Sequence, residues 1–156
     1  MAKPTVGKKV TAFSAASTGS GGSVSSKDLA GAPYVLYFYP KDDTPGCTLE
    51  GQGFRDQQSA FKRLRVRVLG VSRDSLGSHE KFRAKYSLPF DLLSDTDEKL
   101  CKQFDVIKEK NMYGKKVLGI ERSTFLVDAD GVLRSEWRKV KVDGHVDEVL
   151  TAAKAL

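Results

Sequence analysis

The chain has 156 residues and a mass of 17.1 kDa, with 40% hydrophobic and 29% charged residues. This length and composition predict one soluble globular domain over residues 1–156, with a full hydrophobic core. No apolar run approaches the ~20 residues of a membrane-spanning helix, and the first residues lack the apolar region of a secretion signal. We therefore expect a cytoplasmic location and no membrane partner.

The formal net charge is +6 and the pI is about 9.3, which permits anionic partners without requiring one. The basic residues are scattered and interleaved with acids, whereas nucleic-acid-binding proteins concentrate their charge on one face with a recognisable motif. Solvated surface charge is the preferred interpretation, and no nucleic-acid partner is expected. A basic nucleic-acid-associated or chaperone-like protein stays as an alternative suggested by the pI.

Two cysteines, Cys47 and Cys101, exclude a disulfide scaffold. There is no C-x-x-C motif, so neither a zinc knuckle nor a thioredoxin-type dithiol is available. The only histidines, His79 and His145, do not lie at metal-ligand spacing to a cysteine. The sequence therefore predicts no metal site, and no cofactor is expected.

Taken in order, the chain begins with small residues and glycines over residues 11–28. They favour a weak β-hairpin that turns at residues 19–22, with a flexible linker as the alternative. Beyond it, apolar and β-branched runs predict strands, and apolar residues at helical spacing predict helices. The expected elements are a strand over 34–39, a helix from Cys47 to about Leu64, a strand over 65–72, a helix over 75–86 that Ser75 caps, a short strand over 89–93 and a short helix over 97–105.

Residues 108–117, KEKNMYGKKV, predict an exposed loop around Gly114. Two strands, 122–128 and 132–137, then flank a hairpin signal at 129–131, and a last helix begins at Asp143 or Gly144. Strands thus alternate with helices before an antiparallel hairpin closes a mixed sheet. The predicted class is α/β: a thioredoxin-like fold with a mixed central sheet flanked by helices and an N-terminal β-hairpin extension.

Cys47 lies where the strand over 34–39 passes through a polar loop into a helix, directly after Pro45 and Gly46. The first N–H groups of a helix lack internal partners and its dipole is positive there, and both favour a thiolate over a thiol. Cys47 is therefore a candidate nucleophile. The alternative is a small buried hydrophobic residue, the usual fate of a free cysteine, but its Pro, Gly, Thr and Asp neighbours form no apolar stripe.

The spacing Pro40-x-x-x-Thr44-x-x-Cys47, followed by Glu50, resembles the active-site pattern of the peroxiredoxins. The longer run YFYPKDDTPGCTLE is similar to their bacterioferritin-comigratory (PrxQ) subfamily, and the resemblance covers residues 7–153. It implies the thioredoxin-like fold and a thiol peroxidase in which Cys47 attacks the O–O bond of a peroxide.

Such chemistry needs an ionised thiol, alignment with the O–O bond and stabilisation of the leaving oxygen. The hydroxyl of Thr44 can reach the sulfur or the peroxide, Pro40 shapes the loop and limits water access, and the N–H groups of Gly46 and Cys47 can donate to the substrate. The alternative for Thr44 and Pro40 is ordinary turn chemistry.

The resemblance also implies a cation near the sulfur. It points to Arg122, because Arg122-Ser-Thr-Phe125 matches the family's R-x-x-F motif. By the same resemblance, Glu50 orients an arginine instead of acting as a base. A carboxylate beside a thiolate disfavours the charged sulfur and must be neutralised. The alternatives are a surface strand residue for Arg122 and an exposed helix carboxylate for Glu50.

The sequence departs from the subfamily in its resolving cysteine. One usual position is Gln52 here, and the other falls within residues 81–84, which read Lys-Phe-Arg-Ala. The remaining thiol, Cys101, lies on the apolar side of its predicted helix, which favours a buried core residue. Cys101 as the resolving cysteine, after local unfolding, is the alternative.

The expected function is reduction of hydrogen peroxide and organic hydroperoxides by Cys47, which becomes a sulfenic acid. Thioredoxin, glutaredoxin or a small thiol such as glutathione then recycles it, in antioxidant defence. The resemblance suggests a monomer or at most a weak dimer. The alternatives are a redox sensor and a non-catalytic binding module of the same fold.

Overall fold

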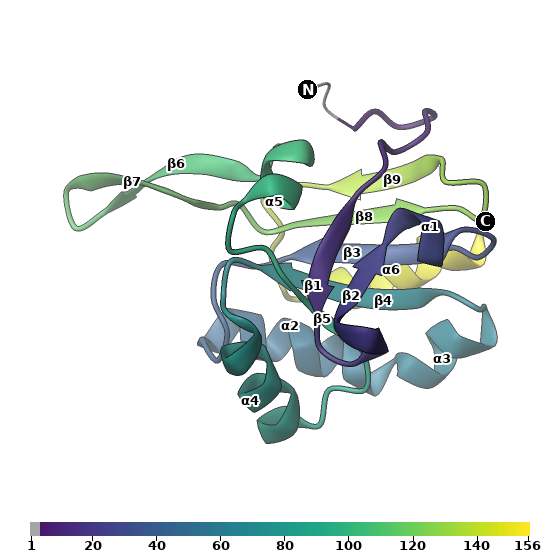
Figure 1. Ribbon diagram of the computed structural model, residues 1–156, viewed down its shortest axis with the longest axis horizontal. Coiled ribbons are helices and arrows are strands. Elements are labelled where there is room, and N and C mark those ends of the chain that lie inside the picture. The colour runs from purple at the N-terminus through teal and green to yellow at the C-terminus, as the bar shows by residue number, and fades with distance from the viewer. Residues whose placement is uncertain (1–3) are drawn as a thin grey trace.

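A seven-stranded mixed sheet forms the centre of the computed structural model, which describes residues 4–156 (Figure 1). The first three residues of the predicted domain lie outside the described residues. The sheet consists of β1 (Ser14–Ser17), β2 (Ser23–Ser25), β3 (Tyr34–Phe38), β4 (Arg67–Ser72), β5 (Leu92–Ser94), β8 (Ser123–Val127) and β9 (Leu133–Trp137). A separate two-stranded ribbon consists of β6 (Ile107–Met112) and β7 (Lys115–Ile120).

The strand order in the large sheet is β2-β1-β5-β4-β3-β8-β9. The three inner strands β3, β4 and β5 run parallel, while β8 and β9 add antiparallel pairs at one side and β1 and β2 at the other. The helices are α1 (Ser26–Leu29), α2 (Pro45–Asp56), α3 (Gln58–Arg63), α4 (Leu76–Tyr86), α5 (Lys99–Gln103) and α6 (His145–Lys154). The mixed sheet flanked by helices and the N-terminal hairpin are confirmed.

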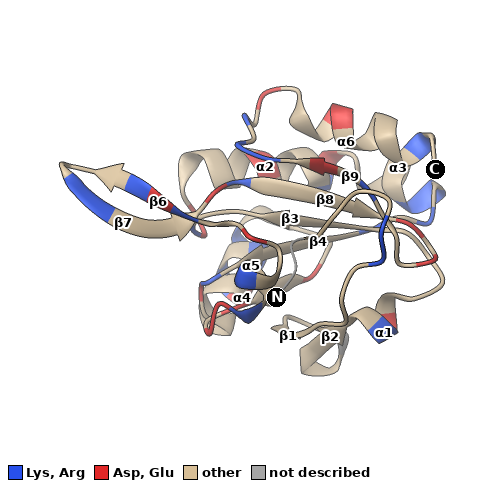
Figure 2. Cartoon of the chain, turned by 90° about the horizontal axis from the view of Figure 1, so that it is seen from above, with Lys and Arg blue, Asp and Glu red and all other residues tan. Residues whose placement is uncertain are grey.

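Alternation along β3 divides the interior into two hydrophobic clusters. Leu36 and Phe38 belong to one cluster, and Tyr37 belongs to the other, because successive strand side chains point to opposite faces. All residues of β3 are buried, as expected for a central strand covered on both sides. Helices α2, α3 and α6 lie together over one face of the sheet in Figure 2, and their apolar residues, such as Phe54, belong to the cluster of Tyr37.

Several element boundaries differ from the sequence expectations. The predicted helix from Cys47 to Leu64 is divided into α2 and α3 at Gln57, whose backbone has φ −102° and ψ 10°. The short strand predicted over 89–93 lies at Leu92–Ser94, and the helix predicted over 97–105 is limited to Lys99–Gln103. Ser75 does cap α4, because its hydroxyl accepts a hydrogen bond from the Ser78 N–H at 3.2 Å.

The exposed loop predicted over 108–117 is wrong, because these residues form the β6–β7 ribbon. Tyr113 and Gly114, with φ of 53° and 80°, form a two-residue connection of the kind that matches the twist of paired strands. The ribbon projects from the body of the protein (Figure 1), so its side chains lack the apolar alternation that packing on a core would impose. Among residues 4–156, no helix has the length and apolarity to cross a membrane.

Gly70 in the middle of β4 generates a prediction on stability. A Cβ at this position would lie 2.8 Å from a Leu92 methyl group and 2.9 Å from the Tyr37 ring. We expect Gly70→Ala to lower the free energy of unfolding by about 1–3 kcal/mol through overpacking. Urea denaturation followed by circular dichroism measures this value.

Gly77, in the first turn of α4, provides the matched control. A Cβ at this position would have the Ser75 hydroxyl as its nearest neighbour, at 3.9 Å, so Gly77→Ala adds no clash. It should leave stability unchanged or raise it by up to about 1 kcal/mol, because alanine favours helix. Equal losses in the two variants would contradict the close-packing explanation.

Candidate active site

Cys47 is the third residue of α2, at the end of the sheet where β3 passes into that helix. Thr44 is the N-cap with extended backbone, and Pro45 occupies the first helical position, where a missing N–H costs nothing. The loop from β3 therefore delivers Cys47 into the first turn, as the sequence predicts. The thiol is nearly covered, since the residue is only 1% exposed.

One guanidinium connects the cysteine to a buried carboxylate. Arg122 Nη2 lies 3.4 Å from Cys47 Sγ, and Arg122 Nη1 lies 2.6 Å from Glu50 Oε1. Burial alone would lower the pKa of Arg122, but the negative charges of Glu50 and Cys47 outweigh it and raise this pKa. The guanidinium is therefore a permanent positive charge in contact with the sulfur.

Arg122 reaches the sulfur from the residue before β8, which pairs antiparallel with β3. Gly46 makes the approach possible. A Cβ on Gly46 would lie 3.0 Å from Arg122 Nη2, so any side chain there would push against the guanidinium. The glycine before the cysteine therefore leaves space for the guanidinium.

Glu50 is fully buried, with 0% exposure, so the exposed helix carboxylate considered as its alternative is wrong. Burial raises its pKa to about 7, although the charge of Arg122 and its hydrogen bond oppose the change. Glu50 Oε2 and the Tyr37 hydroxyl are both buried without a hydrogen-bond partner among residues 4–156. The pKa of Tyr37 is raised well above its usual value by burial and then by the charge of Glu50.

Thr44 makes a contact that the sequence did not predict. Its hydroxyl donates to the Lys41 carbonyl at 2.8 Å, within the loop that follows Pro40. The Thr44 oxygen lone pairs are left to accept a hydrogen bond. The N–H groups of Gly46 and Cys47 donate to no other residue in the range 4–156, as expected for the first turn of a helix.

A buried polar network fixes this loop to α4. The Asp42 carboxylate accepts from the Tyr39 hydroxyl at 2.6 Å and the Ser78 hydroxyl at 2.7 Å, and lies 2.7 Å from His79 Nδ1. Because His79 Nε2 lies 2.9 Å from the Leu93 carbonyl, both ring nitrogens face acceptors. Contacts from both ring nitrogens of His79 therefore hold the loop two residues before Thr44.

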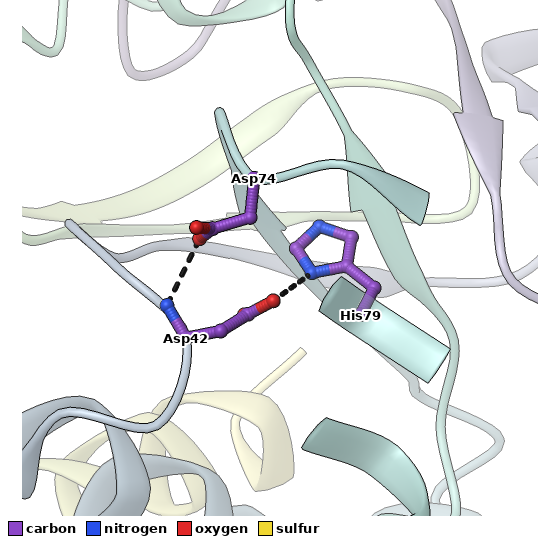
Figure 3. A group of neighbouring side chains, drawn as sticks. All are labelled: Asp42, Asp74 and His79. Carbon is purple, nitrogen blue, oxygen red and sulfur yellow. Dashed lines mark hydrogen bonds and ion pairs between the residues drawn. The ribbon is translucent and has the colours of Figure 1, made fainter. Parts of the chain in front are cut away.

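Figure 3 shows the Asp42 carboxylate directed at His79 and the Asp74 carboxylate directed at the Asp42 backbone nitrogen, and one potential ligand atom from each residue lies within 4.8 Å of the others. Their spacing would suit a metal ion. However, Asp74 accepts from the Asp42 N–H at 2.9 Å and from the Ser72 hydroxyl, and His79 uses both nitrogens in hydrogen bonds. The group is built as a hydrogen-bonded anchor, and the absence of a metal site stays a prediction.

The two cysteines belong to different halves of the interior. Cys47 belongs to the cluster that contains Tyr37, and Cys101 belongs to the cluster that contains Phe38, on the opposite face of the sheet. Cys101 is fully buried at 0% exposure, and burial followed by the nearby Asp95 raises its pKa far above the usual value. The central sheet therefore separates the two thiols.

Comparisons with known proteins show the family of this chain. Residues 6–136 match the AhpC/TSA family. Peroxiredoxin Bcp of Xanthomonas campestris is 60% identical over 81% of this chain and 79% of its own length, and peroxiredoxin Bcp of Bacillus subtilis is 52% identical over 86% and 85%.

Solved structures show the same relationship. A structure of peroxiredoxin Q from Xanthomonas campestris has a TM-score of 0.86 at 54% identity, covering 92% of this chain and 90% of that one. A cysteine-to-serine mutant of PrxQ from Xylella fastidiosa has a TM-score of 0.91 at 44% identity, covering 99% and 98%. The fold and the cysteine at the start of α2 thus define a thiol peroxidase with a thioredoxin-like fold.

The chain belongs to the AhpC/TSA family and, within it, to the peroxiredoxins of the Bcp (PrxQ) type. The predicted family and fold are confirmed. A non-catalytic binding module, considered from the sequence, is not supported, because the named relatives at high identity are enzymes of this family.

Some residues around the site were missed by the sequence analysis. Asp42 and His79 lie 37 residues apart, and nothing local in the sequence pairs them. His145, whose Nε2 lies 2.7 Å from the Thr124 hydroxyl, has its pKa lowered to about 4 by burial and then by the charge of Arg122. Lys110 was expected in an exposed loop. Its position in β6 could have been predicted only from the pairing of β6 with β7 across the Tyr113-Gly114 turn.

Glu50 generates a prediction on the pH dependence of stability. Its folded pKa of about 7 exceeds the ~4.3 of an unfolded glutamate, so the folded state holds this proton more tightly. The Glu50 contribution is therefore most favourable below pH ~4.3 and is lost as the pH rises to about 7, by up to about 3 kcal/mol. Glu50→Gln should lack this loss.

Urea denaturation of the unsubstituted protein and of Glu50→Gln between pH 4.5 and 7.5 measures this loss of stability. The contributions of the other titrating groups are shared by the two proteins and cancel in the difference. Glu80→Gln, on the exposed side of α4, serves as the control and should follow the unsubstituted protein. Parallel stability curves for the unsubstituted protein and Glu50→Gln would contradict the raised pKa.

Proposed function

We propose that Cys47 is the peroxidatic residue of a one-cysteine peroxidase, with the whole chain acting as one catalytic domain. The thiolate sulfur attacks the nearer peroxide oxygen, the O–O bond breaks, and the product oxygen leaves with a proton as water or an alcohol. The sulfur is left as a sulfenic acid. The observation that carries the proposal is the contact of Arg122 with both Cys47 and Glu50.

The surrounding groups suit the stages of this reaction. Arg122 and the free N–H groups of Gly46 and Cys47 would stabilise the charge that develops on the leaving oxygen. The Thr44 oxygen, whose own proton is directed to Lys41, would accept a hydrogen bond from the peroxide O–H. Pro40 shapes the start of the loop that holds Thr44. Substrate would therefore be aligned between the loop and the guanidinium.

Both hydrogen peroxide and organic hydroperoxides are proposed as substrates. A hollow beside the first turn of α2 is lined by Pro45, Leu49 and Tyr86, among others, and Leu49 is 61% exposed. These apolar surfaces would accommodate the alkyl group of an organic hydroperoxide. One relative, the bacterioferritin comigratory protein of Xanthomonas campestris, has alkyl peroxide reduction activity that has been studied through structures of trapped intermediate and ligand complexes.

An external thiol is proposed as the reductant. Neither Gln52 nor residues 81–84 supply a second thiol, and the sheet separates Cys101 from Cys47. A thiol of thioredoxin, glutaredoxin or glutathione would attack the sulfenic acid, release water and form a mixed disulfide that a second thiol cleaves. Thioredoxin is the preferred choice. The cytoplasmic location, the monomeric state and the lack of a nucleic-acid partner stay predictions.

The cysteine assignment is tested by oxidation with one equivalent of hydrogen peroxide. A sulfenic-acid trap should label Cys47 and leave Cys101 unmodified, as read by intact mass and a peptide map. Cys47→Ser should abolish both the label and peroxide consumption, whereas Cys101→Ser should retain both. A disulfide between the two cysteines would contradict the one-cysteine proposal, and failure of Cys47 to oxidise would contradict its peroxidatic role.

The role of Arg122 is tested by Arg122→Lys, which keeps the charge but not the two-pronged geometry. We expect the second-order rate of Cys47 oxidation to fall about 10- to 10³-fold, because one donor to the developing charge is lost. Rapid-quench mass spectrometry measures this rate. Arg63→Lys, on the exposed surface of α3, should react at the unsubstituted rate, and equal rates in all three proteins would exclude a role for Arg122.

A further inference from the structure

The β6–β7 ribbon has two unlike faces. Residues directly opposite on paired strands share a face, and the face alternates at each step. One face, the lysine face, consists of Lys108, Lys110, Met112, Lys115, Val117 and Gly119. The other contains the only acid of the two strands, Glu109, whose carboxylate lies 3.5 Å from Lys116 Nζ. The lysine face therefore carries three cations and no acid.

The outer part of this face is exposed, whereas Lys108 and Lys110 are half-buried and Gly119 is buried. Met112 is 51% and Val117 39% exposed, and Tyr113 at the tip is 101% exposed. Lys108 has an acidic neighbour in Asp105 at 3.1 Å, but Lys110 and Lys115 form no ion pair within residues 4–156. Figure 2 shows the lysines as blue segments on both strands of the projecting ribbon. Apolar side chains between cations of this kind on a projecting ribbon suit contact with an anionic protein surface.

The base of the ribbon borders the peroxidatic site. β7 ends at Ile120, two residues before Arg122. Lys110 pairs with Val117, but its side chain reaches over Gly119, where a Cβ would be 3.2 Å from Lys110 Cδ and 3.7 Å from its Nζ. The lysine therefore points along the ribbon toward its base, where Arg122 follows β7. Burial, followed by the charge of Arg122, lowers the pKa of Lys110, and the charge of Cys47 opposes this change. A partner seated on this face would thus lie beside Cys47.

We propose that the lysine face is the docking surface for the protein that reduces Cys47, and that this protein carries acidic side chains around a dithiol. The inference rests on the proposed function, which requires a thiol from outside the chain. A small thiol would need no ribbon of six residue pairs, about 20 Å long. A second copy of this chain, with a net charge of +6 and the same cationic face, would be repelled.

Lys115 and Lys116 offer a matched test, because they are neighbours on opposite faces of the ribbon. The probe is a purified thioredoxin of net negative charge, with dithiothreitol as an uncharged small reductant. We expect Lys115→Glu to lower the second-order rate of reduction by thioredoxin about tenfold and to weaken its dependence on salt. Lys116→Glu should change the rate less than about twofold. Both variants should match the unsubstituted protein with dithiothreitol and in the oxidation of Cys47 by hydrogen peroxide.

The outcomes separate this inference from the proposed function. Equal thioredoxin rates in the two variants, or reduction by dithiothreitol but not by thioredoxin, would overturn the docking surface and leave the peroxidase intact. Failure of hydrogen peroxide to oxidise Cys47 would overturn the peroxidase itself. Binding to a DNA column is measured as well. If the unsubstituted protein binds DNA and Lys115→Glu does not, while the thioredoxin rates are unchanged, the face would be assigned to nucleic acid instead. Circular dichroism melting curves confirm that both variants are folded.

Discussion

The ion pair between Arg122 and Glu50 is the interaction on which the rest of the site depends. A guanidinium placed against Cys47 without a counter-charge would be mobile and partly solvated, and its orientation would vary. Glu50, one helical turn after Cys47, fixes one prong at 2.6 Å and thereby directs the other to the sulfur at 3.4 Å. The position of the positive charge beside Cys47 is thus set by a carboxylate that does not itself touch the sulfur.

This arrangement requires a carboxylate in a fully buried place, which opposes folding. Removing an ionised group from water is unfavourable unless a partner and hydrogen bonds compensate, and Glu50 Oε2 has no partner among residues 4–156. The pKa of Glu50 is raised because the unfavourable effect of burial exceeds the stabilisation by Arg122. The anchor of Asp42 and His79 on the other side of the loop has all its polar atoms engaged. The anchor that holds the loop is therefore fully hydrogen-bonded, whereas the Arg122–Glu50 pair contains one buried carboxylate oxygen without a partner among residues 4–156.

The sequence predicted those parts of the site whose residues are close in the chain. Cys47, with Gly46 before it, follows from one strand–loop–helix pattern, and the family motif added Thr44, Glu50 and, from a distant strand, Arg122. Pairing of Asp42 with His79 could not be predicted, because it depends on where α4 packs and not on any periodicity. The β6–β7 ribbon was missed for a different reason: a strand pair without a buried face lacks the alternation by which strands are recognised.

The same separation of faces is the basis for the proposal that Cys47 is reduced by a thiol from outside the chain. Strand β3 places Tyr37, toward Cys47, on one side and Phe38, toward Cys101, on the other, so a bond between the thiols would require the central sheet to open. Opening seven paired strands costs far more than moving a surface segment, because it exposes the buried apolar area of both clusters. Gln52 and residues 81–84 offer no thiol either, so under the proposed function a sulfenic acid at Cys47 would be reduced by a thiol from outside the chain. If the proposed function holds, recognition of the reductant would be a property of the surface beside Arg122, and the chemistry of recycling would depend on which partner that surface binds.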